Sequence, residues 1–181
     1  GIVMNAGVSE SRHPREFCEL IDWVEVVRIV DGKTKRVLIS AQEMNWTYRH
    51  SWGWQPGVIV RAGLSWPNQP DEDIAVRVRE VNRTRLLKQP LDLPSGGSVF
   101  VNPPGGISAG ALIESCGLKG YQVRGAKVSE KHANFVVNVA NATAADIDGV
   151  IRHVQERVLN EKGIGLKTEI IHLGSWPNRS P

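Results

Sequence analysis

The hydrophobic pattern of this chain changes at residues 67–90, from strands alone to strands that alternate with helices. No other feature limits the possible folds as strongly. Upstream of the switch, runs of β-branched residues predict strands over Trp23–Val30, Arg36–Ile39 and Gly57–Trp66. Asp31-Gly32, between the first two runs, is typical of a two-residue hairpin turn. The part of the chain before residue 67 is therefore expected to be rich in β-structure.

The segment after Pro70 has the charge order of a helix. Acidic residues at positions 71–73 open it and basic residues at positions 83, 85 and 88 lie toward its end, which complements the helix dipole. Pro90 is expected to end this helix. The predicted domains are residues 1–70 and residues 71–174, followed by a loose tail over residues 175–181.

Strands and helices alternate downstream of Pro90. The expected strands cover Ser98–Val101, Tyr121–Val128, Ala133–Val139 and Leu166–Leu173. The expected helices cover Ser108–Cys116, closed by Gly117, and a segment that starts with Thr143 and Asp146 as a capping box and stops at Gly163. This order predicts an α+β fold, in which a β-rich first domain precedes an α/β sandwich with helices on one face of a sheet.

Composition excludes several classes of protein. Hydrophobic residues make up 41% of the chain and charged residues 23%, as in ordinary globular proteins. The 2 cysteines form no CxxC pair, so neither a disulfide scaffold nor a metal site is expected. The uncharged stretch Leu93–Ile113 contains five glycines and three prolines, which is incompatible with a membrane helix. No N-terminal signal pattern is visible, and we expect a cytoplasmic protein without membrane partners.

The net charge of +3 is compatible with nucleic acid, with a phosphorylated metabolite or with no anionic partner. We interpret the cations between Arg77 and Lys88 as a solvated helix face, so nucleic acid is not predicted as a partner. The chain opens on the apolar run Gly1–Met4. That opening indicates a part of a larger polypeptide or a cleaved product.

Several groups of residues could carry chemistry, and each also has a plain structural interpretation. Ser98 follows two glycines and is either a reactive hydroxyl or part of a turn. Arg49 could clamp a carboxylate or lie in a solvated loop, and Lys119 and His132 could bind phosphate or be solvated. Glu169 could act as an acid or lie exposed at a strand edge. The residues alone leave these alternatives open.

Taken in order, six segments resemble one family. They are Asn5-Ala6-Gly7, Tyr48-Arg49-His50-Ser51, Gln89–Pro103, Ala109–Gly120, Val128–Phe135, and the pair Glu169 and Gly174. Their order and spacing resemble the C-terminal half of UDP-N-acetylenolpyruvoylglucosamine reductases, also called UDP-N-acetylmuramate dehydrogenases. The resemblance spans nearly the whole chain, and several motifs at consistent spacing are more specific than any one of them.

The resemblance implies a flavoenzyme of peptidoglycan precursor synthesis, in which NADPH reduces FAD and a hydride then passes to an enolpyruvyl group. It implies that Ser98 gives a proton to the substrate, while Arg49 and a protonated Glu169 stabilise the enolate. The cofactor contacts that it implies are Asn5, Ala6, Gly7 and Arg49. The contacts to the UDP-sugar substrate that it implies are Tyr48, Asn102, Lys119 and His132.

The chain also departs from the family pattern. Val101 stands where the family usually has lysine, Arg124 where it has glycine, and Ile171 where it has arginine. The glycine-rich flavin-binding portion of the family would precede Gly1, so FAD binding is expected to need that portion, supplied in one chain or as a separate partner chain. The alternative function is a non-catalytic UDP-sugar-binding module or an inactive fragment of the enzyme.

Overall fold

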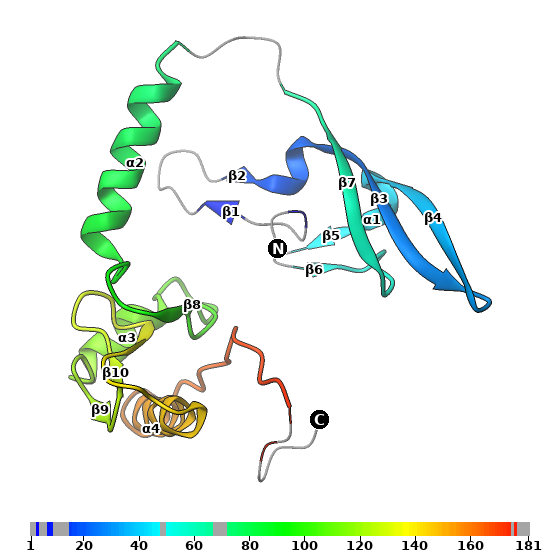
Figure 1. Cartoon of the computed structure of the whole chain (residues 1–181). Helices are drawn as coiled ribbons and strands as arrows, with labels where there is room; N and C mark the ends of the chain where they lie inside the picture. The colour runs from blue at the N-terminus through cyan, green and yellow to red at the C-terminus, as the bar shows by residue number, and fades with distance from the viewer. Residues whose placement is uncertain are drawn as a thin grey trace. The chain divides into compact units, whose positions relative to one another are not determined.

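The computed structural model describes residues 3, 7–8, 15–47, 50–66, 72–174 and 176. The chain divides into two compact units, Gly1–Ala75 and Val76–Pro181, and each is described here by itself (Figure 1). Strands dominate the first unit and helices cover a sheet in the second, which confirms the α+β class. The domain limits expected from the sequence stay a prediction, and the tail, apart from Trp176, lies outside the described residues.

A three-stranded antiparallel sheet in the order β4-β3-β7 forms the body of the first unit. Its strands are β3 (Ile21–Val30), β4 (Lys33–Ser40) and β7 (Val58–Leu64). Asp31 and Gly32 join β3 to β4 with φ angles of 53° and 71°, as a type I′ hairpin turn requires. The predicted hairpin and the predicted third strand are therefore confirmed.

Short elements complete the first unit. They are β1 (Gly7–Val8), β2 (Arg15–Glu16), a 3₁₀ turn (Phe17–Leu20), α1 (Ala41–Met44), β5 (Trp46–Thr47) and β6 (His50–Ser51). The small core of this unit consists of Ile21, Val24, Val26 and Ile39 of the sheet and Met44 of α1. Val24 and Val26 share one face because every second side chain of a strand points to the same side.

The buried Glu25 on β3 is held by arginines of both neighbouring strands. Its carboxylate lies 2.6 Å from Nε of Arg61 on β7 and 3.7 Å from Nη1 of Arg36 on β4. The hydrogen bond from Arg61 is the main cause that lowers the pKa of Glu25 below its ordinary value. The charge can remain in the sheet because it is paired.

Helix α2 spans Ile74–Lys88, as the charge order predicts. None of its residues is buried, and the apolar side chains of Ile74 and Val78 are 55% and 51% exposed. Its last turn carries Arg85 and Lys88, which complement the helix dipole, whereas its first turn carries no acidic residue.

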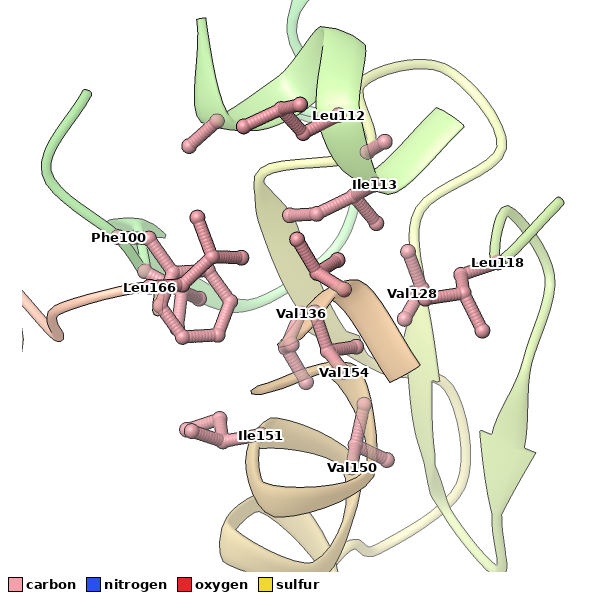
Figure 2. Packing of buried hydrophobic residues seen from close by; sticks show 14 of the residues in the cluster. Phe100, Leu112, Ile113, Leu118, Val128, Val136, Val150, Ile151, Val154 and Leu166 are labelled. Carbon is pink, nitrogen blue, oxygen red and sulfur yellow. The ribbon is translucent and has the colours of Figure 1, made fainter. Parts of the chain in front are cut away.

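The second unit is built on a four-stranded antiparallel sheet in the order β8-β11-β10-β9. Its strands are β8 (Ser95–Ser98), β9 (Gln122–Val123), β10 (Ala126–Val128) and β11 (Phe135–Asn138), and its helices are α3 (Ala109–Ser115) and α4 (Ala144–Lys162). Side chains of both helices pack on one face of this sheet and form a single core, part of which Figure 2 shows. This arrangement is the sandwich that the alternation of strands and helices predicts.

Strand register decides which side chains enter that core. Ala126, Val128 and Val136 point to the helices, and Figure 2 shows Val128 and Val136 between residues of α3 and α4. Lys127 pairs with Val137, and these two alternate with the core residues, so they lie on the opposite face of the sheet. One face of this sheet is therefore covered by α3 and α4, and the other face carries side chains such as Lys127 and Val137.

Helix α4 begins with a complete capping box. The Asp146 carboxylate accepts hydrogen bonds from the Thr143 backbone N–H at 2.9 Å and from the Thr143 hydroxyl at 2.8 Å. These two bonds lower the pKa of Asp146 below its ordinary value of 3.8. Gly163, with φ of 69°, closes the helix, so both ends are confirmed where the sequence placed them.

We expect Asp146→Asn to reduce the dependence of stability on acid pH. A carboxyl whose pKa is lowered by folding stabilises the protein above its unfolded pKa, and this contribution is lost as the pH falls through the folded value. Urea unfolding at pH values from about 5 down to about 2 should therefore show a flatter curve for the variant. Glu156→Gln, at an exposed position of the same helix, is the matched control. An unchanged slope in Asp146→Asn would contradict the assignment.

Four strand predictions downstream of Pro90 are wrong in their limits, and the strand expected over Ala133–Val139 is the shorter β11. The strand expected over Ser98–Val101 is β8, which ends at Ser98. The strand expected over Tyr121–Val128 is split into β9 and β10 by a turn at Arg124 and Gly125. The strand expected over Leu166–Leu173 is reduced to one bridge between Phe100 and Thr168, after which His172 contacts Asp148 of α4 at 3.1 Å.

Arg124 occupies a left-handed conformation with φ of 48°. An L-residue pays about 1–2 kcal/mol there, whereas glycine does not. Its guanidinium lies 4.0 Å from Asp146, at the β9 edge of the sheet, and β8 lies at the other edge. The residue therefore strains a turn at the edge of the sheet opposite to β8.

We expect Arg124→Gly to increase the free energy of unfolding by about 0.5–1 kcal/mol, because relief of the strain exceeds the extra flexibility of the unfolded chain. Chemical denaturation measures this change. Arg124→Lys keeps the charge and the Cβ atom, and it should leave stability unchanged. Equal stability of the glycine and lysine variants would show that the backbone conformation is not the cause.

Candidate functional site

Ser98 ends β8 and its side chain is exposed. It pairs with Phe135 of β11, so both side chains lie on the same face of the sheet. Phe135 and Val137 share that face by alternation, and Val137 pairs with Lys127. The hydroxyl expected to carry chemistry therefore stands on the sheet face that α3 and α4 do not cover.

Residues 99–101, which follow Ser98, are hydrogen-bonded to Asn134 on one side and to residues 167–169 on the other. Val99 donates its N–H to the Asn134 carbonyl at 2.9 Å. The side-chain amide of Asn134 accepts from the Phe100 N–H at 2.9 Å and donates to the Phe100 carbonyl at 2.8 Å. The Phe100 ring is 2% exposed and belongs to the core of the unit (Figure 2).

Glu169 lies beside this segment. Its N–H donates to the Val99 carbonyl at 2.8 Å, and Val101 donates to the Lys167 carbonyl at 3.0 Å. The backbone next to Ser98 is thus hydrogen-bonded to the backbone of Glu169, although 71 positions separate the two residues (169 − 98). The Glu169 side chain is partly buried.

Lys119 and His132 both lie beside α3. Lys119 forms an ion pair with Glu114 of α3, in which Nζ and Oε1 are 2.6 Å apart. Burial lowers the pKa of His132 below its ordinary value, and the Lys119 ammonium acts in the same direction. A Cβ atom at Gly110 would lie 3.2 Å from the His132 ring, so the glycine allows the ring to pack against α3.

The hydrogen bonding of His132 defines its tautomer. Its Nδ1 atom accepts the N–H of Asn134 at 3.2 Å. A neutral imidazole that accepts at Nδ1 carries its proton on Nε2. His132 therefore offers a neutral Nε2–H donor beside the Lys119 cation, and this pair suits a ligand with phosphate oxygens.

Asn102 contributes to the start of α3. Its side-chain oxygen accepts the N–H of Ala109 at 3.0 Å, and the Ser108 hydroxyl accepts the N–H of Ala111 at 3.2 Å. The amide is exposed. Asn102 thus joins the segment after Ser98 to the helix that carries Glu114.

Other expected site residues lie outside the described part of the chain. Tyr48 and Arg49 stand between β5 and β6, and Asn5 and Ala6 precede β1; none of the four is described. Gly7 is in β1, where it pairs with Glu16. Their predicted roles stay predictions.

A hollow of about 190 Å³ opens near Lys127 and Val137. A larger hollow of about 400 Å³ lies by Gly96, Val99 and Ile170, and its volume falls within the range of about 300–1,000 Å³ that is usual for small-molecule sites. Among the described residues, no group of three histidine, cysteine or acidic side chains could hold a metal ion. The helices of the described residues include none that is long and apolar enough to cross a membrane.

Sequence reasoning missed Asn134 and Glu114. Asn134 is a single amide between the buried Ala133 and Phe135, and a lone polar residue in an apolar run is a signal of a buried hydrogen bond. Glu114 precedes Lys119 by five positions across a glycine turn, a spacing that does not reveal an ion pair. Only the fold brings these partners together.

The fold defines an α+β protein whose second unit carries Ser98 on the sheet face without helices, and Lys119 and His132 beside α3. The family described as UDP-N-acetylenolpyruvoylglucosamine reductase, C-terminal domain, matches residues 89–173. A UDP-N-acetylenolpyruvoylglucosamine reductase of Caldanaerobacter subterraneus subsp. tengcongensis is 42% identical over 179 residues, covering 96% of this chain and 55% of the relative.

A further relative and a solved structure carry the same enzyme name. The reductase of Moorella thermoacetica is 44% identical over 171 residues, covering 93% of this chain and 53% of the relative. The crystal structure of UDP-N-acetylenolpyruvylglucosamine reductase from Thermus caldophilus matches with a TM-score of 0.74 and 37% identity, over 92% of this chain and 56% of that one. The chain belongs to the UDP-N-acetylenolpyruvoylglucosamine reductase family. It spans about half the length of the curated relatives that it matches.

Proposed function

We propose that this chain provides the substrate-binding part of an NADPH- and FAD-dependent reductase that converts UDP-N-acetylglucosamine enolpyruvate to UDP-N-acetylmuramate. The reaction belongs to peptidoglycan precursor synthesis in the cytoplasm. The observation that carries the proposal is the backbone pairing that joins the segment after Ser98 to Glu169. It brings together the two chain segments that carry the Ser98 hydroxyl and the Glu169 carboxyl, in a chain whose relatives are named as this reductase.

Each residue of the proposed site has a role that suits its chemistry. Ser98 gives its hydroxyl proton to C2 of the enolpyruvyl group after a hydride has reached C3, and solvent then returns a proton to the serine oxygen. The Glu169 carboxyl and Arg49 stabilise the enolate charge that builds on the substrate carboxylate in between. Tyr48 and the amide NH₂ of Asn102 hold the substrate.

The Lys119 and His132 pair is the proposed contact for the diphosphate of the UDP-sugar. A cation beside a neutral N–H donor can bind phosphate oxygens without placing two positive charges side by side. The ion pair with Glu114 fixes the ammonium at one end of α3.

FAD supplies the hydride when it is bound, after reduction by NADPH. The residues proposed to contact it are Asn5, Ala6, Gly7 and Arg49. Of these, Gly7 is described, and a residue without a side chain lets the backbone approach a flat ring closely. FAD binding is proposed to need the flavin-binding portion that the relatives have in addition to the matched part.

A second candidate is a UDP-sugar-binding module without turnover. Val101 favours it, because the family usually has a lysine there and a cation is therefore missing next to the proposed substrate. This candidate keeps the Lys119 and His132 contact and lacks the hydride transfer.

The test compares binding and turnover. Calorimetric titration of the chain with the UDP-sugar enolpyruvate measures binding, and Lys119→Met should weaken it while Lys88→Met, in the exposed α2, should not. Turnover is measured as NADPH oxidation in the presence of FAD, for the chain alone and for the chain joined to the part of the Caldanaerobacter relative that it does not match. We call the joined form the assembled enzyme. Binding without turnover supports the module, and the absence of both overturns the proposed function.

A further inference from the structure

Asn134 is a buried amide in contact with several parts of the proposed site. It is 5% exposed and precedes β11. Its side chain makes two hydrogen bonds to the backbone of Phe100, one as acceptor and one as donor. Buried amides are costly unless both halves are satisfied, and here both are.

The side-chain amide of Asn134 makes the hydrogen bonds that the backbone of a neighbouring strand would otherwise make. Pairing of β8 with β11 ends at Ser98 and Phe135. Beyond that point the backbone of residues 99–101 would lack a partner on this edge, and the Asn134 carbonyl and side chain take the N–H of Val99 and both polar groups of Phe100. The other edge of the same segment pairs with residues 167–169.

Phe100 stands midway between two proposed substrate contacts. Ser98 lies two residues before it and Asn102 two residues after it. Because a fixed backbone at Phe100 limits the movement of both neighbours, the amide bonds determine where the hydroxyl can stand. They also fix the segment to which Glu169 is hydrogen-bonded.

We propose that Asn134 is a positioning residue, whose side-chain amide locks the segment between Ser98 and Asn102 against Glu169 and so places the proton-donating hydroxyl. This inference rests on the proposed function. The Asn134 side chain and its backbone N–H then have separate roles. The side chain holds the backbone of Phe100, and the N–H holds the His132 ring, which side-chain substitutions leave unchanged. Binding of the diphosphate and delivery of the proton should therefore respond differently to a change at Asn134.

Asn134→Asp tests the lock because it can be opened and closed by pH. An ionised carboxylate accepts from the Phe100 N–H but cannot donate to the Phe100 carbonyl, whereas a protonated carboxyl can do both. Burial raises the pKa of a carboxyl at this place. The lock should be broken at neutral pH and restored as the pH falls, because the folded state then takes up the proton more readily than the unfolded chain.

Asn138→Asp is the matched control. The Asn138 side chain lies at the end of the same strand and accepts the N–H of Ala142 at 3.0 Å, which a carboxylate also can do. The titratable groups nearest to Asn134 come from three elements. They are Glu130, Lys131 and His132 on the loop before it, Glu114 of α3 with its ion-pair partner Lys119, and Lys167 and Glu169 on the segment bonded to residues 99–101. All of them remain in the wild type and in both variants, so any pH effect that they cause is shared.

Three measurements follow on these proteins. In Asn134→Asp at neutral pH, we expect the amide hydrogens of Val101 and Glu169 to exchange faster and affinity for UDP to stay at the wild-type value. In the assembled enzyme, substrate reduction by the reduced flavin should slow by about 100-fold, the effect of a displacement of about 1 Å. Lower pH should restore both the exchange protection and the relative rate, and Asn138→Asp should show none of this.

The outcomes separate the two proposals. A wild-type rate per folded Asn134→Asp molecule, with altered exchange, would make Asn134 merely structural and overturn the inference. An equal loss of UDP affinity and of rate would also overturn it. If the wild-type assembled enzyme shows no reduction, the proposed function fails. Protection of the Glu169 amide, taken relative to the wild type at the same pH, then still tests the lock. Protection in Asn134→Asp that recovers as the pH falls supports the lock, and protection that stays unchanged overturns it.

Discussion

Ser98→Ala is expected to slow reduction of the enolpyruvyl substrate by about 10²–10⁴-fold, the usual contribution of a positioned proton donor. Flavin reduction by NADPH should keep its wild-type rate, because the serine takes part only after the hydride has reached the substrate. Anaerobic stopped-flow measurements of the assembled enzyme follow both half-reactions through flavin absorbance near about 450 nm. The methyl group left behind conserves the backbone, so the change reports on the hydroxyl.

Ser95→Ala is the control for this prediction. Ser95 lies in the same strand, is exposed, and pairs with Val137 of β11. Its removal should alter neither half-reaction. If Ser98→Ala slowed both half-reactions equally, the hydroxyl would have a role in binding or folding and not in proton delivery.

Local sequence signals predicted the elements that depend on local physics. Asp31-Gly32 forms the hairpin turn because both residues can adopt positive φ. Thr143 with Asp146, and Gly163, mark the ends of α4 because capping bonds and the left-handed closing residue involve only near neighbours. Such contacts span few positions and leave a pattern in the sequence.

Elements that depend on a distant partner were harder to predict. Residues 166–173 have the apolar pattern of a strand, but the segment pairs with residues 99–101 over a short stretch and then turns toward Asp148. The turn at Arg124 was missed because arginine carries no signal for a left-handed conformation. A strand needs a partner along its whole length, and the pattern of one segment does not supply it.

In the candidate site, too, the sequence indicated individual residues but not the contacts between residues that are distant in the chain. The resemblance to the family named Ser98, Glu169, Lys119 and His132, and the structure describes where each lies. The order of the motifs could not show that Glu169 is hydrogen-bonded to the backbone beside Ser98, because this contact depends on the tertiary fold. Asn134 was not singled out, since its bonds to Phe100 reach across 34 positions.

Ile151→Ala is expected to lower the free energy of unfolding by about 2–5 kcal/mol. Ile151 is fully buried on α4, in the core that joins both helices to the sheet (Figure 2). Shortening the side chain leaves a cavity where neighbouring groups cannot close in completely, so the lost contacts add to the lost hydrophobic burial. Urea unfolding followed by circular dichroism measures the change.

Leu159→Ala on the same helix removes a side chain that is 51% exposed. It should cost much less than Ile151→Ala, because most of the leucine surface already contacts solvent in the folded state. The comparison matters for the site, since α4 supports the sheet face opposite to the one that carries Ser98. Similar losses from both substitutions would mean that the core between α4 and the sheet does not hold this unit together.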